Sequence, residues 1–118
     1  DLAGEPVLIH VLRRCAAISG VDRVICATVE GVESAPIAEI AARCGALVFR
    51  GYESDVLQRY AGAARAAAAD VVMRVTSDCP LIDPGLCGAV RRNPNCSLLR
   101  LPGWIAYDAA RAWIQTRA

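Results

Sequence analysis

The sequence predicts an α/β domain in which helices cover both faces of a parallel sheet. Segments with helical spacing alternate with short apolar, β-branched segments along residues 6–91, a pattern typical of right-handed strand–helix–strand crossovers. The chain has 118 residues, of which 55% are hydrophobic and 21% are charged. This length and composition indicate one globular domain.

Four helices are expected from the apolar spacing, over residues 6–18, 35–44, 55–69 and 84–91. Ser34, Ser54 and Asp83 are expected to cap the second, third and fourth of them, because short polar side chains satisfy the free amides of a first turn. Between the helices lie three apolar runs, which predict strands over residues 23–29, 46–49 and 71–76. Runs of this kind favour strands that are covered on both faces.

The character of the chain changes at Arg92. Proline, glycine and tryptophan follow without a clear strand pattern, and residues 108–116 are expected to form a short helix. The chain is therefore predicted to consist of an α/β unit, residues 1–91, and an atypical tail, residues 92–118.

Composition excludes several classes of function. Thirteen basic residues, all of them arginine, nearly balance twelve acidic ones, so the chain lacks the charge of a protein that binds nucleic acid or a membrane surface. No apolar run reaches the roughly 20 residues of a spanning helix. Without lysine, the chain cannot supply a lysine nucleophile, a Schiff base or a P-loop lysine.

The six cysteines are interpreted as free thiols. No pair has the C-x-x-C spacing of a zinc site, and His10 is the one histidine of the sequence. The chain also has enough apolar residues to form a core without disulfides. We therefore expect Cys15, Cys26 and Cys44 to be small buried hydrophobic residues of a protein in a reducing cytoplasm.

Two loops are expected beyond the carboxyl ends of the strands, where open parallel sheets bind ligands. The loop at residues 49–55 precedes a helix N-terminus, whose free amides can receive an acceptor. The alternative is an ordinary connection capped by Ser54 or Asp55. In the loop at residues 76–84, Asp78 directly follows a strand and is suited to hold a hard cation between nucleotide phosphates. The alternative is a turn-forming aspartate.

These loops belong to a longer pattern of order and spacing. It consists of Leu2-Ala3-Gly4-Glu5-Pro6-Val7-Leu8, Val24-Ile25-Cys26-Ala27-Thr28, Val48-Phe49-Arg50-Gly51, Ser54-Asp55-Val56-Leu57-Gln58-Arg59-Tyr60, Ala69-Asp70-Val71-Val72-Met73-Arg74-Val75-Thr76 and Asp78-Cys79-Pro80-Leu81-Ile82-Asp83-Pro84. The pattern resembles the cytidylyltransferase family of spore coat polysaccharide biosynthesis proteins, which is related to the enzymes that make CMP-activated acidic sugars. The two stretches after Phe49 and after Thr76 are specific when taken together.

The resemblance implies the three-layer, Rossmann-like fold of nucleotide-diphospho-sugar transferases. It implies transfer of a cytidylyl group from CTP to a sugar or sugar acid in polysaccharide biosynthesis, with Mg²⁺ neutralising charge on the phosphates. Carried over by motif, Asp78 would hold the metal, while Arg50, Gly51, Ser54 and Asp55 would border the nucleobase pocket. The resemblance also allows a homodimer.

The chain departs from the family pattern at both ends. Family members begin with a strand and a Gly-Ser-rich loop that wraps the triphosphate, whereas this chain begins just after that loop. The family's later Gly-Leu-Asp motif is not found either. The first strand of the family is expected between residues 23–29 and 71–76, so the sheet must close a gap or lose its central ladder of hydrogen bonds. We therefore expect an inactive fragment.

Several alternatives remain open from the sequence. A non-catalytic α/β remnant or binding module is the alternative to an enzyme. A receiver-type signalling domain is disfavoured, because it would need a lysine at a strand end and this chain has none. Arg59 and Arg74 match the family pattern without an assigned role, and packing is the alternative for both. The tail is either the product of a shifted reading frame or a divergent segment that packs Trp104 and Trp113 on the core.

Overall fold

Helices and strands alternate through the residues that the computed structural model describes, 1–92 and 111–116. In chain order the elements are α1 (Val7–Ala16), β1 (Arg23–Val29), the 3-10 helix η1 (Val32–Ser34), α2 (Ala35–Arg43), β2 (Leu47–Gly51), α3 (Val56–Ala66), β3 (Val71–Arg74), α4 (Pro84–Arg92) and β4 (Arg111–Thr116). Within these ranges no helix has the length and apolar character needed to cross a bilayer.

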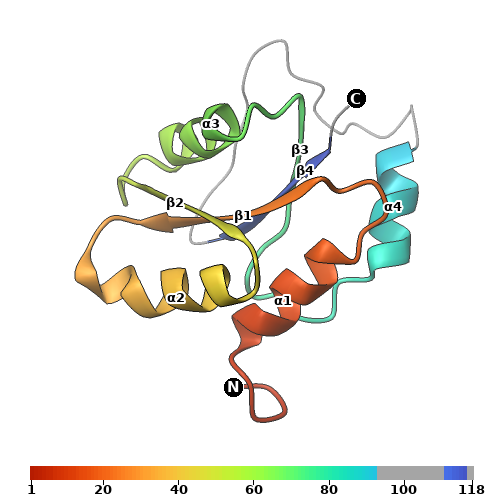
Figure 1. Ribbon diagram of the computed structural model, residues 1–118, viewed down its shortest axis with the longest axis horizontal. Helices are drawn as coiled ribbons and strands as arrows, with labels where there is room; N and C mark the ends of the chain where they lie inside the picture. Colours follow the sequence, from red (N-terminus) through yellow and green to blue (C-terminus); the bar gives the residue numbers. More distant parts are fainter. Residues whose placement is uncertain (93–110, 117–118) are drawn as a thin grey trace.

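The strands form one sheet in the order β2-β1-β4-β3 (Figure 1). Strands β1 and β2 are parallel, with Cys26 opposite Val48. Strand β4 is antiparallel to both β1 and β3, so β1, β2 and β3 all run in the same direction. The prediction of three mutually parallel strands near residues 23–29, 46–49 and 71–76 is confirmed.

The centre of the sheet holds a strand that the sequence analysis did not predict. In β4, Trp113 lies opposite Ile25 of β1 on one side and opposite Arg74 of β3 on the other. The expected helix over residues 108–116 is therefore wrong, and the expected gap in the sheet is closed by the chain's own later segment. The physical reason is tertiary, because the facing edges of β1 and β3 need backbone partners. The Trp, Ile and Thr residues of this segment also suit a strand.

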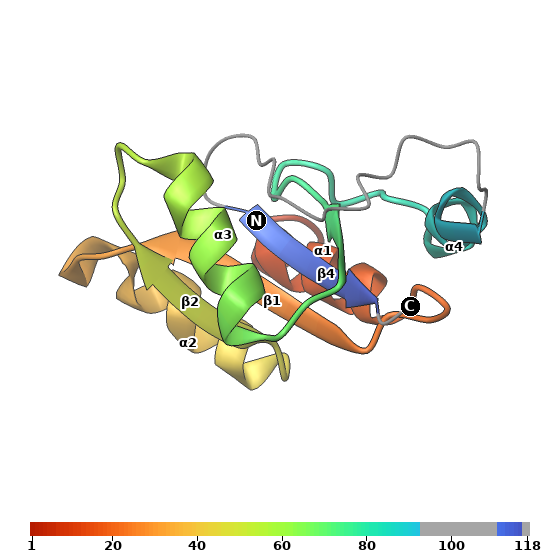
Figure 2. The same cartoon turned by 90° about the horizontal axis from the view of Figure 1, so that it is seen from above.

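The helices form a layer on each face of the sheet, as predicted. Figure 2 shows α3 on one side and α1 and α2 on the other. The alternating side chains of β1 separate two cores accordingly. Cys26 joins a buried cluster with Val11 and Cys15 of α1, whereas Ile25 and Ala27 pack with Tyr60 of α3.

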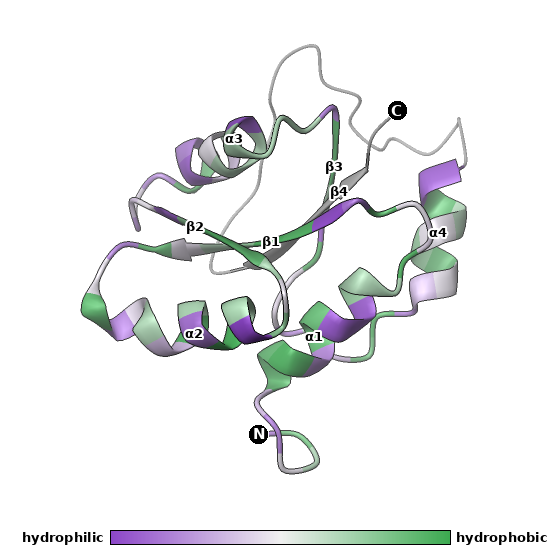
Figure 3. Ribbon diagram, viewed as in Figure 1, coloured by the Kyte–Doolittle hydropathy of each residue, from purple (hydrophilic) through white to green (hydrophobic). Residues whose placement is uncertain are grey.

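Hydropathy follows this layering with one exception at the edge of the sheet. Figure 3 shows hydrophobic residues along much of β1 and β2, and mixed hydrophobic and hydrophilic residues on α1, α2 and α3. Such mixing is typical of helices that have one face on a core. However, Leu47 and Val48 of β2 are partly exposed, so this edge strand is less completely covered than its apolar sequence predicts.

Two of the three predicted helix caps differ from the prediction. Asp83 does cap α4, because its Oδ1 accepts a hydrogen bond from the Leu86 amide at 2.7 Å. Asp55 rather than Ser54 caps α3. Ser34 stands at the N-cap position of α2 but makes no capping bond. Its buried hydroxyl is 2.7 Å from the Val29 carbonyl oxygen, to which it donates.

The burial of the thiols predicts their order of alkylation. Desolvation raises the pKa of Cys15 to about 12 and that of Cys26 to about 11, whereas Cys79 is exposed. At mildly alkaline pH we expect iodoacetamide to modify Cys79 in the native protein and to leave Cys15 and Cys26 intact, because the thiolate is the reactive form. Peptide mass mapping measures this order, and equal modification in denaturant is the control. Native modification of Cys15 as fast as that of Cys79 would contradict the observed packing. Cys96 lies outside the described residues.

Candidate functional site

The two predicted loops lie at the same edge of the sheet. Because β2 and β3 run in the same direction, the segments that leave Gly51 and Arg74 both start from the carboxyl-terminal edge. The cavity beside Asp78 is lined by residues 74–76, 78–83, 86 and 87, and by none of residues 50–55. The expectation of a common edge is confirmed, and a common cleft stays a prediction.

Asp78 is exposed in a loop whose turn is held by hydrogen bonds between residues close in the sequence. The Cys79 amide donates to the Thr76 carbonyl at 3.1 Å, and the Thr76 hydroxyl lies 3.0 Å from the Cys79 sulfur. A hydrogen bond from the Thr76 side chain is the largest influence holding the pKa of Asp78 below its ordinary value. The residue's own amide, the Cys79 thiol and the charge of Arg74 act in the same direction. Asp78 is therefore a carboxylate at neutral pH.

The cavity next to Asp78 has a volume of about 660 Å³ and a mostly apolar wall. Its wall is formed by the loop between β3 and α4 and by the first turn of α4. The loop is tied to α1 on its far side, because the Arg14 guanidinium donates to the Ile82 carbonyl at 3.2 Å. Leu81 and Leu86 are largely exposed here. The arrangement places two carboxylates, Asp78 and Asp83, in the wall of a mostly apolar cavity, which can cover an apolar or ring-shaped ligand face.

Asp78 fits the metal that the resemblance implies. Mg²⁺ prefers oxygen ligands and is commonly held by one or two carboxylates together with substrate phosphates and water. The residues described hold no group of three His, Cys, Asp or Glu side chains that could enclose a metal ion. The exposed carboxylate of Asp78 at the carboxyl-terminal edge therefore suits a cation that is shared with a phosphate ligand, and does not suit a closed protein site.

The predicted nucleobase residues occupy different local settings. Arg50 and Gly51 are the last two residues of β2, opposite Thr28 and Val29, so the strand is longer than predicted. Arg50 is exposed, whereas Gly51 is buried. Ser54 and Asp55 are both exposed.

Asp55 already has a structural partner. Its Oδ1 accepts a hydrogen bond from the Gln58 amide at 2.8 Å, which begins α3. The structure thus brings the four predicted residues onto one strand end and loop. It also gives Asp55 the capping role that was its alternative.

Arg59, to which the sequence analysis assigned no role, also contacts this loop. Its side chain is 2% exposed, and its Nη1 donates to the Tyr52 carbonyl at 2.5 Å. Its stem lies against the Cα of Gly51. The signal in the sequence was an arginine one turn into a helix that directly follows the loop. Charged side chains are almost always exposed, so spacing alone could not show that this one is buried.

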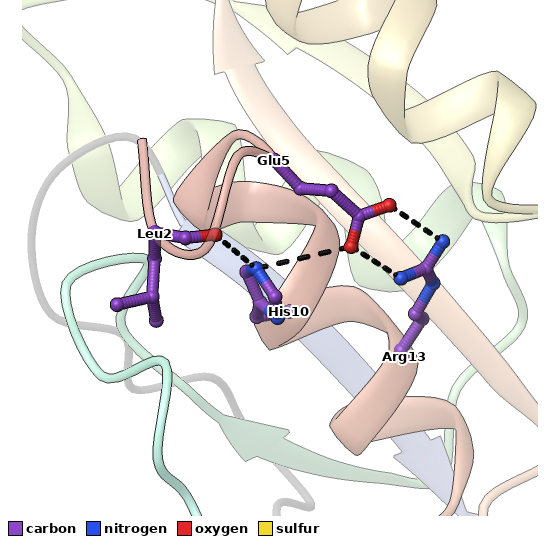
Figure 4. A network of polar contacts seen from close by, with 4 residues as sticks. All are labelled: Leu2, Glu5, His10 and Arg13. Atoms are coloured by element: carbon purple, nitrogen blue, oxygen red, sulfur yellow. Dashed lines mark hydrogen bonds and ion pairs between the residues drawn. The ribbon is translucent and has the colours of Figure 1, made fainter.

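A second polar network fixes the turn before α1 (Figure 4). Leu2 and Glu5 exchange backbone hydrogen bonds of 2.8 and 3.1 Å, across a turn in which Ala3 and Gly4 have positive φ. The Glu5 carboxylate is held by both terminal nitrogens of Arg13, at 2.7 and 3.0 Å. This hydrogen bond is the largest influence lowering the pKa of Glu5. His10 Nε2 lies 2.9 Å from the Leu2 carbonyl oxygen. The network attaches the turn to α1.

Comparison with known proteins identifies what this chain is similar to. A family model described as cytidylyltransferase matches residues 1–94. A 3-deoxy-manno-octulosonate cytidylyltransferase of Anaeromyxobacter sp. (strain Fw109-5) is 40% identical over 87 residues, which are 71% of this chain and 34% of that protein. An uncharacterised protein of Methanocaldococcus jannaschii is 37% identical over 80 residues, which are 68% of this chain and 33% of that protein.

These matches cover only part of each relative. The chain spans about a third of the length of the curated relatives it matches. No solved structure gives a significant match to it. The matched region contains the loops after β2 and β3, so both candidate stretches fall inside the shared part.

Proposed function

Because the chain belongs to the cytidylyltransferase family, we propose that residues 50–55 and Asp78 form part of a site for transfer of a cytidylyl group from CTP to a sugar or sugar acid. The observation that carries the proposal is the position of an ionised Asp78 at the carboxyl-terminal edge of the sheet. Ligands of open α/β sheets bind at this edge. The similarity to a 3-deoxy-manno-octulosonate cytidylyltransferase supports a sugar-acid acceptor.

In the proposed reaction a sugar hydroxyl oxygen forms a bond to the α-phosphorus of CTP. The bond from that phosphorus to the oxygen bridging to the β-phosphate breaks, pyrophosphate leaves, and the hydroxyl proton passes to solvent. Asp78 would hold Mg²⁺ against the phosphates, which supplies neutralisation of their charge. The exposed Arg50 and Ser54 would contact the nucleobase from the neighbouring strand end. We further propose a cytoplasmic role in the synthesis of surface polysaccharide, of which spore coat polysaccharide is one form.

A second candidate function is nucleotide binding without turnover. The cavity wall holds the carboxylates of Asp78 and Asp83, and residues 50–55 lie outside that cavity. Preorganised donors aimed at the phosphates commonly contribute about 3 kcal/mol or more each to the transition state. Arg74 is the one basic side chain among the residues that line the cavity, which favours a binding module that does not itself catalyse the transfer.

The test uses Mn²⁺ as a paramagnetic probe in place of Mg²⁺. With CTP present, we expect Mn²⁺ to broaden the amide NMR signals of residues 76–79. We expect Asp78→Asn to weaken Mn²⁺ binding by about tenfold or more, because a ligand that carries charge is lost. Asp70→Asn is the matched control, since Asp70 is exposed and precedes β3 at the opposite edge.

The pH dependence of this binding has a defined sign. The lowered pKa of Asp78 means that the carboxylate persists at pH values at which an ordinary aspartate is already half protonated. Mn²⁺ broadening should therefore persist at about pH 4, where an ordinary aspartate has lost half of its charge, and should disappear only at lower pH. Equal broadening in Asp78→Asn and in the unaltered protein would place the cation elsewhere and remove the main support for the proposed site.

A further inference from the structure

We infer that Arg59 is the positioning residue of the nucleobase loop, residues 52–55, and that Gly51 and Arg59 act as one interlocked pair. The inference rests on the proposed nucleotide site, of which this loop is one wall. Neither the family resemblance nor the comparisons assign a role to Arg59. Three observations carry the inference: the burial of its guanidinium, the backbone atoms that it holds, and the contact of its stem with Gly51.

The guanidinium of Arg59 is buried, and none of the carboxylates that the structure describes pairs with it. Its side chain is 2% exposed, and within residues 1–92 and 111–116 no acidic group lies within ion-pair distance of it. Its Nε–H has no hydrogen-bond partner in that part of the chain. Burying a charge is costly unless hydrogen bonds compensate it. The backbone carbonyls that Arg59 reaches are therefore its principal compensation, and their positions are coupled to it.

Those carbonyls belong to consecutive residues of the loop. Nη1 donates to the Tyr52 carbonyl at 2.5 Å and approaches the Glu53 carbonyl at 3.4 Å. Two adjacent peptide planes are thus oriented by one cation. The ends of the loop are held separately, because the Glu30 amide donates to the Gly51 carbonyl at 3.0 Å and Asp55 caps α3. Arg59 holds the residues between these two ends, because it donates to their carbonyls. Tyr52 is 63% exposed, so packing stabilises its position little.

Gly51 provides the space that the arginine stem needs. A Cβ built on Gly51 would lie 3.0 Å from Cγ, 3.1 Å from Cβ and 3.3 Å from Cα of Arg59. The backbone of Gly51 is not in the left-handed region, so conformational freedom does not explain the glycine. The close approach to the backbone of Gly51 is made by a side chain of the same protein.

A packing role for Arg59 predicts a different response to substitution. Arg59→Met keeps an unbranched side chain against Gly51 and removes the hydrogen-bond donors. Arg59→Lys keeps the positive charge and a single donor nitrogen. If Arg59 only fills space, Arg59→Met leaves the hydrogen exchange of the loop and the affinity for CTP unchanged. If Arg59 positions the loop, Arg59→Met speeds hydrogen exchange of the loop and weakens CTP binding. Arg59→Lys then shows smaller changes of both.

The first measurement is hydrogen exchange of the loop, which needs no nucleotide. In Arg59→Met we expect the Gln58 amide, which is bonded to Asp55, to exchange about tenfold faster, because loss of a charged hydrogen bond is worth more than 1 kcal/mol. Amides of β1 should keep their protection. Arg65→Met is the matched control, because Arg65 is an exposed arginine on the same helix.

The second measurement is CTP binding, followed by amide shifts of residues 50–55 during titration with CTP and Mg²⁺. We expect Arg59→Met to raise the apparent Kd about fivefold or more, and Arg59→Lys to recover part of the loss. Gly51→Ala should have a similar effect. Combining Gly51→Ala with Arg59→Met should add little to either change, because interlocked residues are not additive.

Each outcome decides the inference. Unchanged exchange of the Gln58 amide in Arg59→Met would overturn it and leave Arg59 a packing residue. Faster exchange with unchanged CTP affinity would separate the loop from nucleotide binding and overturn the positioning role. If the unaltered protein shows no shifts with CTP, the proposed function fails, and hydrogen exchange alone decides whether Arg59 holds the loop. If Arg59→Met does not fold, Arg59→Lys and Gly51→Ala provide the same two measurements.

Discussion

Replacing Ile114 with proline is expected to remove about 3 kcal/mol or more from the free energy of unfolding. Ile114 lies in the middle of β4, opposite Val24 of β1 and Met73 of β3. In a central strand every backbone amide faces a neighbouring strand, and proline cannot donate to either one. Because a domain of this size is stable by roughly 5–15 kcal/mol, the loss is a large share of the total. Urea denaturation followed by circular dichroism measures it.

Hydrogen exchange localises the same effect. Within the described ranges β3 pairs with β4 alone, so the amides of Val71–Arg74 should lose protection before those of β2. Ile114→Val is the matched control, because valine keeps the amide and favours strands. If the β3 amides of Ile114→Pro stay as protected as in the unaltered protein, β4 does not hold the centre of the sheet in solution.

Replacing Tyr60 with alanine is expected to cost about 3–5 kcal/mol, the usual range for removing a buried aromatic ring. Tyr60 is 0% exposed and has the largest of the fully buried side chains among the residues whose burial the structure describes. It packs with Ile25 and Ala27 of β1 between α3 and the sheet. The small residues Ala63 and Ala67 beside it cannot expand to fill the cavity that the ring would leave.

Tyr60→Phe is the matched control for this substitution. It keeps the ring and removes only the hydroxyl, so its cost should be nearer 1 kcal/mol. Thermal or urea unfolding of the two variants gives the comparison. A loss below about 1 kcal/mol in Tyr60→Ala would mean that α3 packs on the sheet less closely than the structure shows.

The fold of residues 1–92 was predictable because its signals are local and agree with one another. Apolar runs and helical spacing fixed three strand positions and their common direction. The helix caps were less predictable, since Ser54 and Asp55 are neighbours with similar capping ability. Strand β4 could not be predicted, because its residues form a strand only where β1 and β3 present free edges. Trp104 and any packing of its side chain lie outside the described residues.

The candidate site was predictable in part for the same reason. Asp78 follows β3 at the expected edge, which the direction of the strands alone determines. The partners that set its pKa, Thr76 and Cys79, depend on how the loop turns and left no pattern in the sequence. The relation of Gly51 to Arg59 is a contact between a strand end and a buried helix side chain. Only coordinates show such a contact.

The position of β4 also sets an order of events during synthesis. The pairing of Ile25 with Trp113 joins segments that emerge from the ribosome far apart in time, and closure of so long a loop is entropically slow. Until residues 111–116 arrive, β1 and β3 expose two unpaired edges, which are templates for association with other chains. Nascent chains that stall before β4 should therefore aggregate or recruit chaperones, whereas released chains should not.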